Sequence, residues 1–156
     1  LINWSRNNFV ISTFSINKPI SPEGWRSFIN LHRVAAGRVT RSKASWMIQR
    51  NQVNEGLAEL LVAHDDHDRL VSAAFCRDID DTTYYSVAAS DRSMFDKPLG
   101  HALIQEAILT AKARGQRYFD LGEAFSSSDE IKLSQIAMFK RGFCRYPTMQ
   151  ITWGSV

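Results

Sequence analysis

The sequence predicts an α/β protein in which helices cover a mixed β-sheet, in the order β-α-α-β-β-β-α-β-α-β. Two helical patterns in the first third are followed by three short strand patterns that tight polar turns separate. Strand and helix patterns then alternate, which is typical of a β-α-β unit with parallel strands. The composition, 44% hydrophobic and 22% charged residues, suits a globular domain with a substantial core.

The first half contains a strand, two helices and a three-stranded meander. Ser21 is placed to cap the first helix, with Pro22 in its first turn, and Gly37 ends it. Alternating apolar residues predict the strands, and the turns DDHD and DIDD separate the last three. The expected ranges are a strand at 7–16, helices at 21–36 and 43–52, and strands at 57–64, 69–78 and 82–89.

The second half adds two helices and two strands. Gly115 suits the C-terminal cap of the first of these helices, and Gly142 breaks the second. The residues at 127–130, SSDE, match a capping box. The expected ranges are helices at 99–114 and 127–141 and strands at 117–121 and 148–153. Without a repeat or a linker, we predict a single domain over residues 1–156.

Several classes of protein are not indicated. No apolar run approaches the roughly 20 residues that cross a bilayer, so we expect no membrane span. Cys76 and Cys144 have no metal-ligand spacing and indicate no disulfide scaffold, so a reducing cytoplasm is the default location. The segment 64–68 resembles a metal cluster in composition, but its place between two strands favours a hairpin turn, and we predict no metal. Because the chain starts at Leu1 rather than Met, we expect it to be part of a longer polypeptide.

Charge is unevenly distributed along the chain. Residues 1–54 carry eight Lys or Arg against the single acid Glu23, a balance of +7, so the remainder carries −4 of the total of +3. Such segregation indicates either an anionic partner for the first third or a solvated basic helical face. Arg38 and Arg41 flank the turn after the first helix, where their forked donors suit a carboxylate or phosphate of an acceptor substrate. His32 lies on the apolar face of that helix, as a core histidine or as an acid–base group.

A candidate phosphate loop precedes the helix at 99–114. The segment 97–102 reads KPLGHA, and a helix start offers unpaired N–H groups and the positive end of the helix dipole. Gly100 and Ala102 keep the backbone open to a pyrophosphate, while Lys97 adds a positive charge. An ordinary helix start is the alternative. The six residues concerned are Lys97, Pro98, Leu99, Gly100, His101 and Ala102.

Two charged residues of the second half lie at positions typical of ligand contacts. Lys140 continues an apolar helical stripe, so it must either extend to solvent or meet a negative charge such as a phosphate or an oxyanion. Asp120 ends the short strand at 117–121, where it is a candidate, with Glu123, for orienting or deprotonating an amine. A turn or capping role is the alternative for Asp120.

The order of elements and the loop KPLGHA resemble the GNAT acyltransferase superfamily. That family's acyl-CoA loop reads Arg/Gln-x-x-Gly-x-Gly/Ala, from which this chain departs by Lys97 in the first position and by Pro98, which removes one N–H. The resemblance implies the GNAT fold and acetyl-CoA or another acyl-CoA as co-substrate. The strand backbone at Val87, Ala88 and Ala89 would then polarise the acyl carbonyl.

A second resemblance covers about residues 97–143. The segments AKARG at 111–115, FDLG at 119–122 and FKRGF at 139–143 look like the C-terminal GNAT domain of Fem-type transferases. That family implies transfer of an acyl or aminoacyl group to an amine in cell-wall peptide or surface polysaccharide synthesis. Its proteins contain two GNAT-like domains, so a missing second domain or a homodimer is the expected partner.

The resemblance leaves the general acid open. GNAT enzymes often place a tyrosine in the last helix, where this chain has Met138 and Phe139. Tyr84, Tyr85 or water would then supply the proton, with Tyr85 as the candidate substrate contact. The favoured hypothesis is an acyl-CoA-dependent N-acyltransferase acting on a small-molecule, glycan or peptide amine. The alternatives are a Fem-type enzyme that uses aminoacyl-tRNA, bound by the basic first third, and a non-catalytic GNAT-like half.

Overall fold

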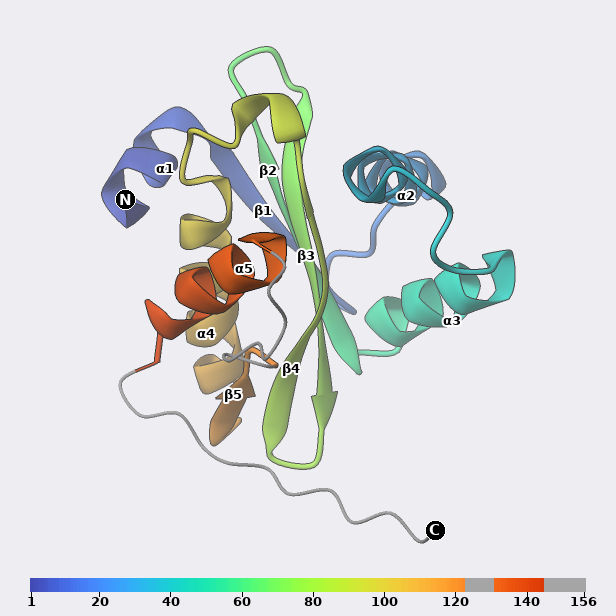
Figure 1. Ribbon diagram of the computed structural model, residues 1–156. Coiled ribbons are helices and arrows are strands. Elements are labelled where there is room, and N and C mark those ends of the chain that lie inside the picture. Colours follow the sequence, from blue (N-terminus) through green and yellow to red (C-terminus); the bar gives the residue numbers. More distant parts are fainter. Residues whose placement is uncertain (123–130, 145–156) are drawn as a thin grey trace, which may run out of the picture. The chain divides into compact units, whose positions relative to one another are not determined.

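The computed structural model describes residues 1–122 and 131–144, and the chain divides into two compact units, Leu1–Asp120 and Leu121–Val156. The first unit contains a five-stranded sheet with helices on both faces (Figure 1). Its elements are α1 (Ile2–Asn8), β1 (Val10–Phe14), α2 (Pro22–Ala36), α3 (Lys43–Asn54), β2 (Ala58–His64), β3 (Leu70–Ile79), β4 (Thr82–Ser90), the 3₁₀ turn η1 (Arg92–Met94), α4 (Leu99–Ala113) and β5 (Tyr118–Asp120). The second unit contains α5 (Ile131–Arg141).

The sheet is mixed, as the sequence predicts. The strand order is β1-β2-β3-β4-β5, with antiparallel pairs up to β4 and a parallel pair between β4 and β5. Because a parallel neighbour requires a crossover, α4 connects the last two strands. The expected strand at 148–153 and the capping box at 127–130 lie outside the described residues.

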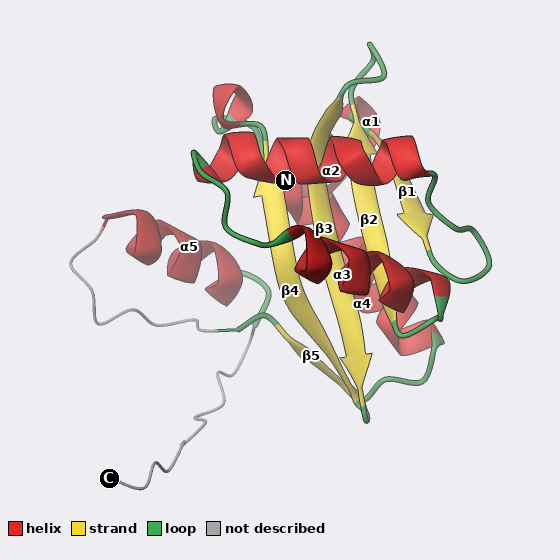
Figure 2. Ribbon diagram, turned by 90° about the vertical axis from the view of Figure 1, so that its right-hand side faces the viewer, coloured by secondary structure: helices red, strands yellow, loops and turns green. Residues whose placement is uncertain are grey.

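The helices α2 and α3 cover one face of the sheet (Figure 2). Both begin as the sequence predicts, because Ser21 accepts a hydrogen bond from the Gly24 amide at 3.0 Å and Ser42 accepts one from Ser45 at 3.1 Å. Gly37 ends α2 with φ 70°, a conformation that favours glycine. The buried residues of this face are Ile20, Trp25, Phe28, Trp46, Val53, Ala58, Leu60, Val62, Ala73, Phe75 and Val87.

The helices α1 and α4 cover the opposite face. Its buried residues are Phe9, Leu61, Ala63, Val71, Cys76, Leu99, Leu103 and Ala107. At the C-terminal end of α4, Arg114 binds Asp78 at 2.9 and 3.1 Å and Glu59 at 2.5 Å. Thr110 also donates to Glu59, and Thr83 donates to Asp78, so this end of α4 is tied to β2, β3 and β4.

The prediction of a strand over 7–16 is wrong at its start. Residues 2–8 form α1, and the strand begins at Val10. The helix is favoured by a tertiary contact, because Ser5 is fully buried and its Oγ donates to the Pro98 carbonyl at 2.6 Å. Arg6 adds an ion pair to Glu106 of α4 at 3.1 Å. Contacts between residues so far apart in the chain leave no periodic signal in a sequence.

A β-bulge divides β4 into two parts. Phe75 of β3 pairs with Val87, whereas the next residue, Cys76, pairs with Tyr85, so Ser86 is the extra residue. The bulge reverses the alternation of side chains. Tyr85 therefore packs on the α4 face and Val87 in the core beneath α2 and α3.

Candidate active site

The edge of β4 is open along its second part. Strand β5 pairs only with residues Thr82 to Tyr84, and no other strand of the described chain lies on that side. The Asp91 backbone amide donates to the Val71 carbonyl of β3 at 2.8 Å. Along an antiparallel pair, only every second residue points its amide toward the neighbouring strand. The amides of Val87 and Ala89 therefore face β3, while those of Ala88 and Ser90 face the open edge. The strand thus presents backbone donors to a ligand at this edge.

Tyr84 and Asp120 lie side by side where the two strands separate. They are partners in the last pair of the parallel ladder, so their side chains project from the same face. Tyr85 and Phe119, their neighbours in the chain, pack against the core of the α4 face. Tyr84 and Asp120 therefore point to the α2–α3 face, where a phenol and a carboxylate lie on neighbouring strands at the end of the strand pairing.

Tyr85 does not fit the predicted substrate contact. Its ring packs with the buried cluster of the α4 face, opposite Cys76 in the register. Burial, followed by the nearby Cys76, raises the pKa of the phenol well above its ordinary range, which makes it a poor proton donor. Burial likewise raises the pKa of the Cys76 thiol to about 12, so this cysteine is no nucleophile.

The loop between β4 and α4 leads from the open edge to a helix start. Pro98 caps α4 without a side-chain hydrogen bond, and its carbonyl accepts from Ser5 Oγ and from the His101 amide at 3.3 Å. The Leu99 amide binds the Lys97 carbonyl at 2.9 Å. In the first turn of α4, the Gly100 amide has no hydrogen-bond partner among the described residues, and neither has the Ala102 amide. The first turn therefore contains unpaired backbone donors of the kind that an anion can accept from.

Side chains of the same segment differ in what they can contribute. Leu99 and Ala102 are buried in the core, so only their backbone can meet a ligand. His101 is half-buried, and this burial lowers the pKa of its imidazole. Lys97 is exposed, lies 3.1 Å from Asp96 and stands over the Trp4 ring at 5.9 Å. Its positive charge therefore lies at the entrance of the loop, shared with one neighbouring carboxylate.

His32 and Arg41 form a cluster with Trp46 at the junction of α2 and α3. Arg41 Nη1 lies 3.3 Å from His32 Nε2, and its guanidinium stands over the Trp46 ring at 5.5 Å. The His32 ring packs edge-on against Trp46 at 5.2 Å. Burial, and then the charge of Arg41, lowers the pKa of His32 and keeps it neutral. Arg38 is exposed on the same loop.

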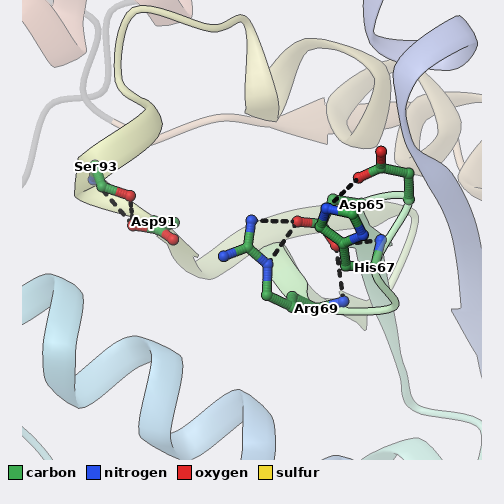
Figure 3. A network of polar contacts seen from close by, with 6 residues as sticks. Asp65, His67, Arg69, Asp91 and Ser93 are labelled. Carbon is green, nitrogen blue, oxygen red and sulfur yellow. Dashed lines mark hydrogen bonds and ion pairs between the residues drawn. The ribbon is translucent and has the colours of Figure 1, made fainter.

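The acidic segment 64–68 is a hairpin turn, as predicted (Figure 3). Asp65 accepts hydrogen bonds from the amides of His67 and Arg69 at 3.0 and 2.9 Å and from Arg69 Nε at 2.8 Å. Asp68 adopts φ 57° to close the turn. In the described part of the chain no three His, Cys, Asp or Glu side chains are grouped to hold a metal ion. None of the helices in residues 1–122 and 131–144 combines the length and apolarity that crossing a bilayer requires.

The second unit brings two predicted motifs together. A Cβ placed on Gly122, which has φ 72°, would lie 3.2 Å from Lys140 Nζ, so the amino group lies against the glycine backbone. Phe139 and Phe143 pack edge-on at 5.4 Å on the same helix end. The half-buried Lys140 thus lies beside Gly122, the last residue of FDLG. Glu123 lies outside the described residues.

Sequence reasoning missed two features of the site. The Ser86 bulge, which places Tyr85 on the α4 face and Val87 on the α2–α3 face, has no sequence signal. The pairing of Tyr84 with Asp120 depends on the register of strands that are far apart in the chain. Conversely, the β4 backbone, Gly100 and Asp120 lie along the sheet edge and its adjoining loop, where the sequence predicts ligand contacts.

Solved structures of low sequence identity share this fold. An aminoglycoside acetyltransferase, meta-AAC0020, from an uncultured soil metagenomic sample has a TM-score of 0.69 at 13% identity, over 96% of this chain and 97% of that chain. AAC(6')-Iy, solved with a bisubstrate analog of CoA and acetylneamine, has a TM-score of 0.68 at 10% identity, over 95% and 97%. A ribosomal-protein-alanine N-acetyltransferase from Brucella melitensis biovar Abortus 2308 has a TM-score of 0.60 at 15% identity, over 94% and 99%. No curated protein sequence matches the chain significantly.

The family assignment rests on the sequence together with this architecture. Residues 23–130 match the family model of the acetyltransferase (GNAT) domain. The matched region runs from α2 through β5 and includes the open edge of β4 and the start of α4. The chain therefore belongs to the GNAT acetyltransferase family, and it is an acyltransferase with the GNAT fold.

Proposed function

We propose that this enzyme transfers an acyl group from acetyl-CoA or another acyl-CoA to an amine by direct attack. The observation that carries the proposal is the open edge of β4, which leads to the first turn of α4 from the amides of Ala88 and Ser90, which have no strand partner among the described residues. An extended pantetheine chain is able to pair with such an edge as a strand would. The pyrophosphate would bind at the Gly100 amide and the positive end of the helix, near Lys97.

The chemistry proposed for the acceptor uses the α2–α3 face of the sheet. The thioester supplies an activated carbonyl, and the Ala88 amide at the open edge would polarise its oxygen. The amine nitrogen attacks the carbonyl carbon, the C–S bond breaks, and an amide forms. Asp120 would take the proton that leaves the nitrogen, while Tyr84 or water would protonate the departing sulfur. Both groups lie on one face at the point where β4 and β5 separate.

A Fem-type relationship is the finer form of this proposal. The short distance between Lys140 and Gly122 supports this relationship, because the two residues belong to FKRGF and FDLG, two of the three segments that carry the resemblance. In that form the acceptor is a cell-wall peptide or a surface glycan, and aminoacyl-tRNA replaces acyl-CoA as the alternative donor. The exposed side chains of Arg38 and Lys43, with the half-buried Arg41 between them, are the observation that favours RNA. We place the reaction in the cytoplasm.

Thermal unfolding with acetyl-CoA tests the donor site. At about 100 times Kd a ligand of the folded state contributes about 2.7 kcal/mol, which for a chain of this size raises Tm by about 5–10 °C. The Gly100→Glu variant places a carboxylate in the proposed pyrophosphate site, and Lys97→Ala removes the neighbouring charge. Both should lose most of the rise, whereas Lys112→Ala, on the exposed side of the last turn of α4, should keep it.

The outcomes separate the hypotheses. A rise in the wild type that Gly100→Glu abolishes supports the acyl-CoA site. A rise that persists unchanged in both loop variants would place the donor elsewhere on the chain. No rise with acetyl-CoA, together with a rise on adding aminoacyl-tRNA, would favour the Fem-type donor, and no rise with either would favour a non-catalytic half.

A further inference from the structure

We propose that residues 37–43, the loop after α2 with the first residue of α3, bind an anionic group of the acceptor, and that the acceptor is an amine that carries a carboxylate. We call this segment the basic loop. The proposal rests on the N-acyltransferase function above and specifies the class of substrate that the site selects.

The first observation is unneutralised charge. Arg38, Arg41 and Lys43 of the basic loop form no ion pair with an acid in the described part of the chain. Of the other cations of the first third, Arg6 pairs with Glu106 and Arg26 with Glu23, whereas the remaining three also form no ion pair in the described part of the chain. The basic loop differs from these in that its three unpaired cations lie within six consecutive residues. The sequence contains no acid between Gly24 and Asn54 that could approach along the chain. The basic loop is therefore a local source of positive potential.

The second observation is that Arg41 is held in place by neutral groups. Its Nη1 contacts His32 Nε2 at 3.3 Å and Thr40 Oγ1 at 3.4 Å, and the guanidinium plane is supported by the Trp46 ring. Thr40 Oγ1 lies 3.5 Å from His32 Nδ1, so the histidine can donate there and accept from Arg41 at Nε2. The neutral imidazole thus orients the arginine without neutralising its charge.

The free donors of Arg41 match a carboxylate. Because Nη1 makes both side-chain contacts, Nε and Nη2 have no hydrogen-bond partner among the described residues. These two donors point in parallel from one edge of the guanidinium, which is the geometry that binds both oxygens of a carboxylate. A fork already fixed by Trp46 and His32 loses little conformational entropy when it binds.

The third observation is position. The basic loop lies on the β4 side of the sheet, over the face that α2 and α3 cover (Figure 2). Tyr84 and Asp120 project from this same face. A pocket of about 270 Å³ lies between α2 and the strand ends, and its lining includes Val34, Ala35 and Ser90, so it reaches the last turn of α2 just before the basic loop. The pocket thus adjoins Ser90 at the open edge of β4, and the last turn of α2 leads from it to the basic loop. In this proposal the acceptor extends from the open edge, where its amine lies, to Arg41, which binds its anionic group.

The positive charge of the basic loop also disfavours acceptors that carry several positive charges. Sisomicin, present in one of the structures of similar fold, is an aminoglycoside, and such compounds carry several ammonium groups. A cluster of unpaired cations repels a polycation and attracts an anion. We therefore infer that this enzyme differs from the aminoglycoside acetyltransferases of similar fold in the charge of its acceptor.

The test is a panel of matched amines with acetyl-CoA. Glycylglycine and glycylglycine amide differ in the carboxylate alone, phosphoethanolamine and ethanolamine provide the phosphate pair, and sisomicin provides the polycation. Release of CoA thiol reports turnover. The rise in Tm on adding each amine to the CoA-bound enzyme reports binding where turnover is too slow to measure. The wild type should favour glycylglycine over its amide by at least ~10-fold in kcat/KM, or in apparent affinity by Tm.

Variants assign the preference to the loop. Arg41→Ala should raise KM for the carboxylate amine about 10- to 100-fold with a small change in kcat, and should leave the neutral amine unaffected. Arg41→Lys keeps the charge but loses the fork, so it should recover only part of the affinity. Arg26→Ala removes an equal charge at the opposite end of α2 and is the matched control. If Arg41→Ala impairs folding, Arg38→Ala tests the basic loop in its place, because the Arg38 side chain is exposed.

Failure of this inference is distinct from failure of the proposed function. If acetyl-CoA does not bind, the donor proposal fails, but the Tm of the protein with each amine still tests the loop. The proposal is overturned if the enzyme uses glycylglycine and its amide equally, or if it prefers sisomicin. It is also overturned if Arg41→Ala lowers kcat/KM equally for the anionic and the neutral amine of a pair, or if no anionic amine gives any response. Salt-sensitive binding of tRNA that Arg38→Ala and Arg41→Ala weaken would overturn it as well, because the loop would then bind a polyanion.

Discussion

Replacing Arg114 tests how α4 is held against the sheet. Its guanidinium makes two hydrogen bonds to Asp78, at 2.9 and 3.1 Å, and an ion pair with Glu59. Glu59 is 8% exposed as a residue, and the side chains of Asp78 and Arg114 are 15% and 28% exposed. The substitution Arg114→Met keeps the apolar stem and removes the charge, which leaves two poorly solvated carboxylates facing one another across the vacated position.

The magnitude follows from this geometry. Breaking a buried ion pair by removing one partner costs about 3–5 kcal/mol. Because the guanidinium is partly exposed, water will solvate part of what remains, so we expect a loss of about 2–4 kcal/mol in the free energy of unfolding. For a chain of this size that is a fall in Tm of about 6–12 °C. The second substitution Glu59→Gln in the same chain should restore about 1 kcal/mol, because it removes one of the unpaired charges.

Urea unfolding followed by circular dichroism measures both values. Arg117→Ala is the matched control, since its side chain is 72% exposed and 3.7 Å from Asp81, and it should change stability by less than about 0.5 kcal/mol. An Arg114→Met protein as stable as the control would refute the reasoning. If Glu59→Gln lowers the stability of Arg114→Met further, the unpaired carboxylates are not the cause of the lost stability.

Two further predictions concern the hairpin turn and the glycine beside Lys140. Burial acts to raise the pKa of Asp65, but hydrogen bonds from Arg69 and the turn amides outweigh it and hold the pKa below its ordinary value of 3.8. The ionised Asp65 carboxylate therefore stabilises the fold above pH 3.8, and this stabilisation is lost as the pH falls through the lower pKa of the folded state. The Tm of Asp65→Asn should then depend less on pH below 3.8 than the Tm of the wild type. An equally steep acid dependence in the variant would contradict this. Gly122→Ala should reduce turnover more than Gly115→Ala, because both have positive φ but only the new methyl at 122 meets Lys140 Nζ, at 3.2 Å. Equal turnover in the two variants would argue against a role for Lys140.

The sequence predicts those parts of the fold that depend on local signals. The cap at Ser21, the end of α2 at Gly37 and the three meander strands all follow from residues a few positions apart. The start of the first strand was missed because α1 is stabilised by the contact of Ser5 with Pro98, 93 residues further along the chain. Local propensity cannot report such a contact.

In the candidate site, too, the sequence predicts features with a local signal and misses those that depend on long-range contacts. Gly100 lies at the start of α4 and Asp120 at the end of β5, as the helix and strand signals predict, and their roles as ligand contacts stay predictions. The face of each tyrosine in β4 was not predictable, because the one extra residue at Ser86 reverses the alternation on which the prediction depends. The fixed orientation of Arg41 depends on the packing of His32 against Trp46, which brings two helices together.

The hydrogen bond from Ser5 to Pro98 also has a consequence for how the molecule forms. During synthesis the first helix leaves the ribosome long before the loop that it supports, and a seven-residue helix is unstable alone in water. It must remain unfolded, or bind elsewhere, until residues 98 to 113 have emerged. The loop proposed for the acyl donor should therefore reach its final shape late, after the meander has paired. A chain shortened to begin at Phe9 should then keep its sheet and lose its affinity for acetyl-CoA.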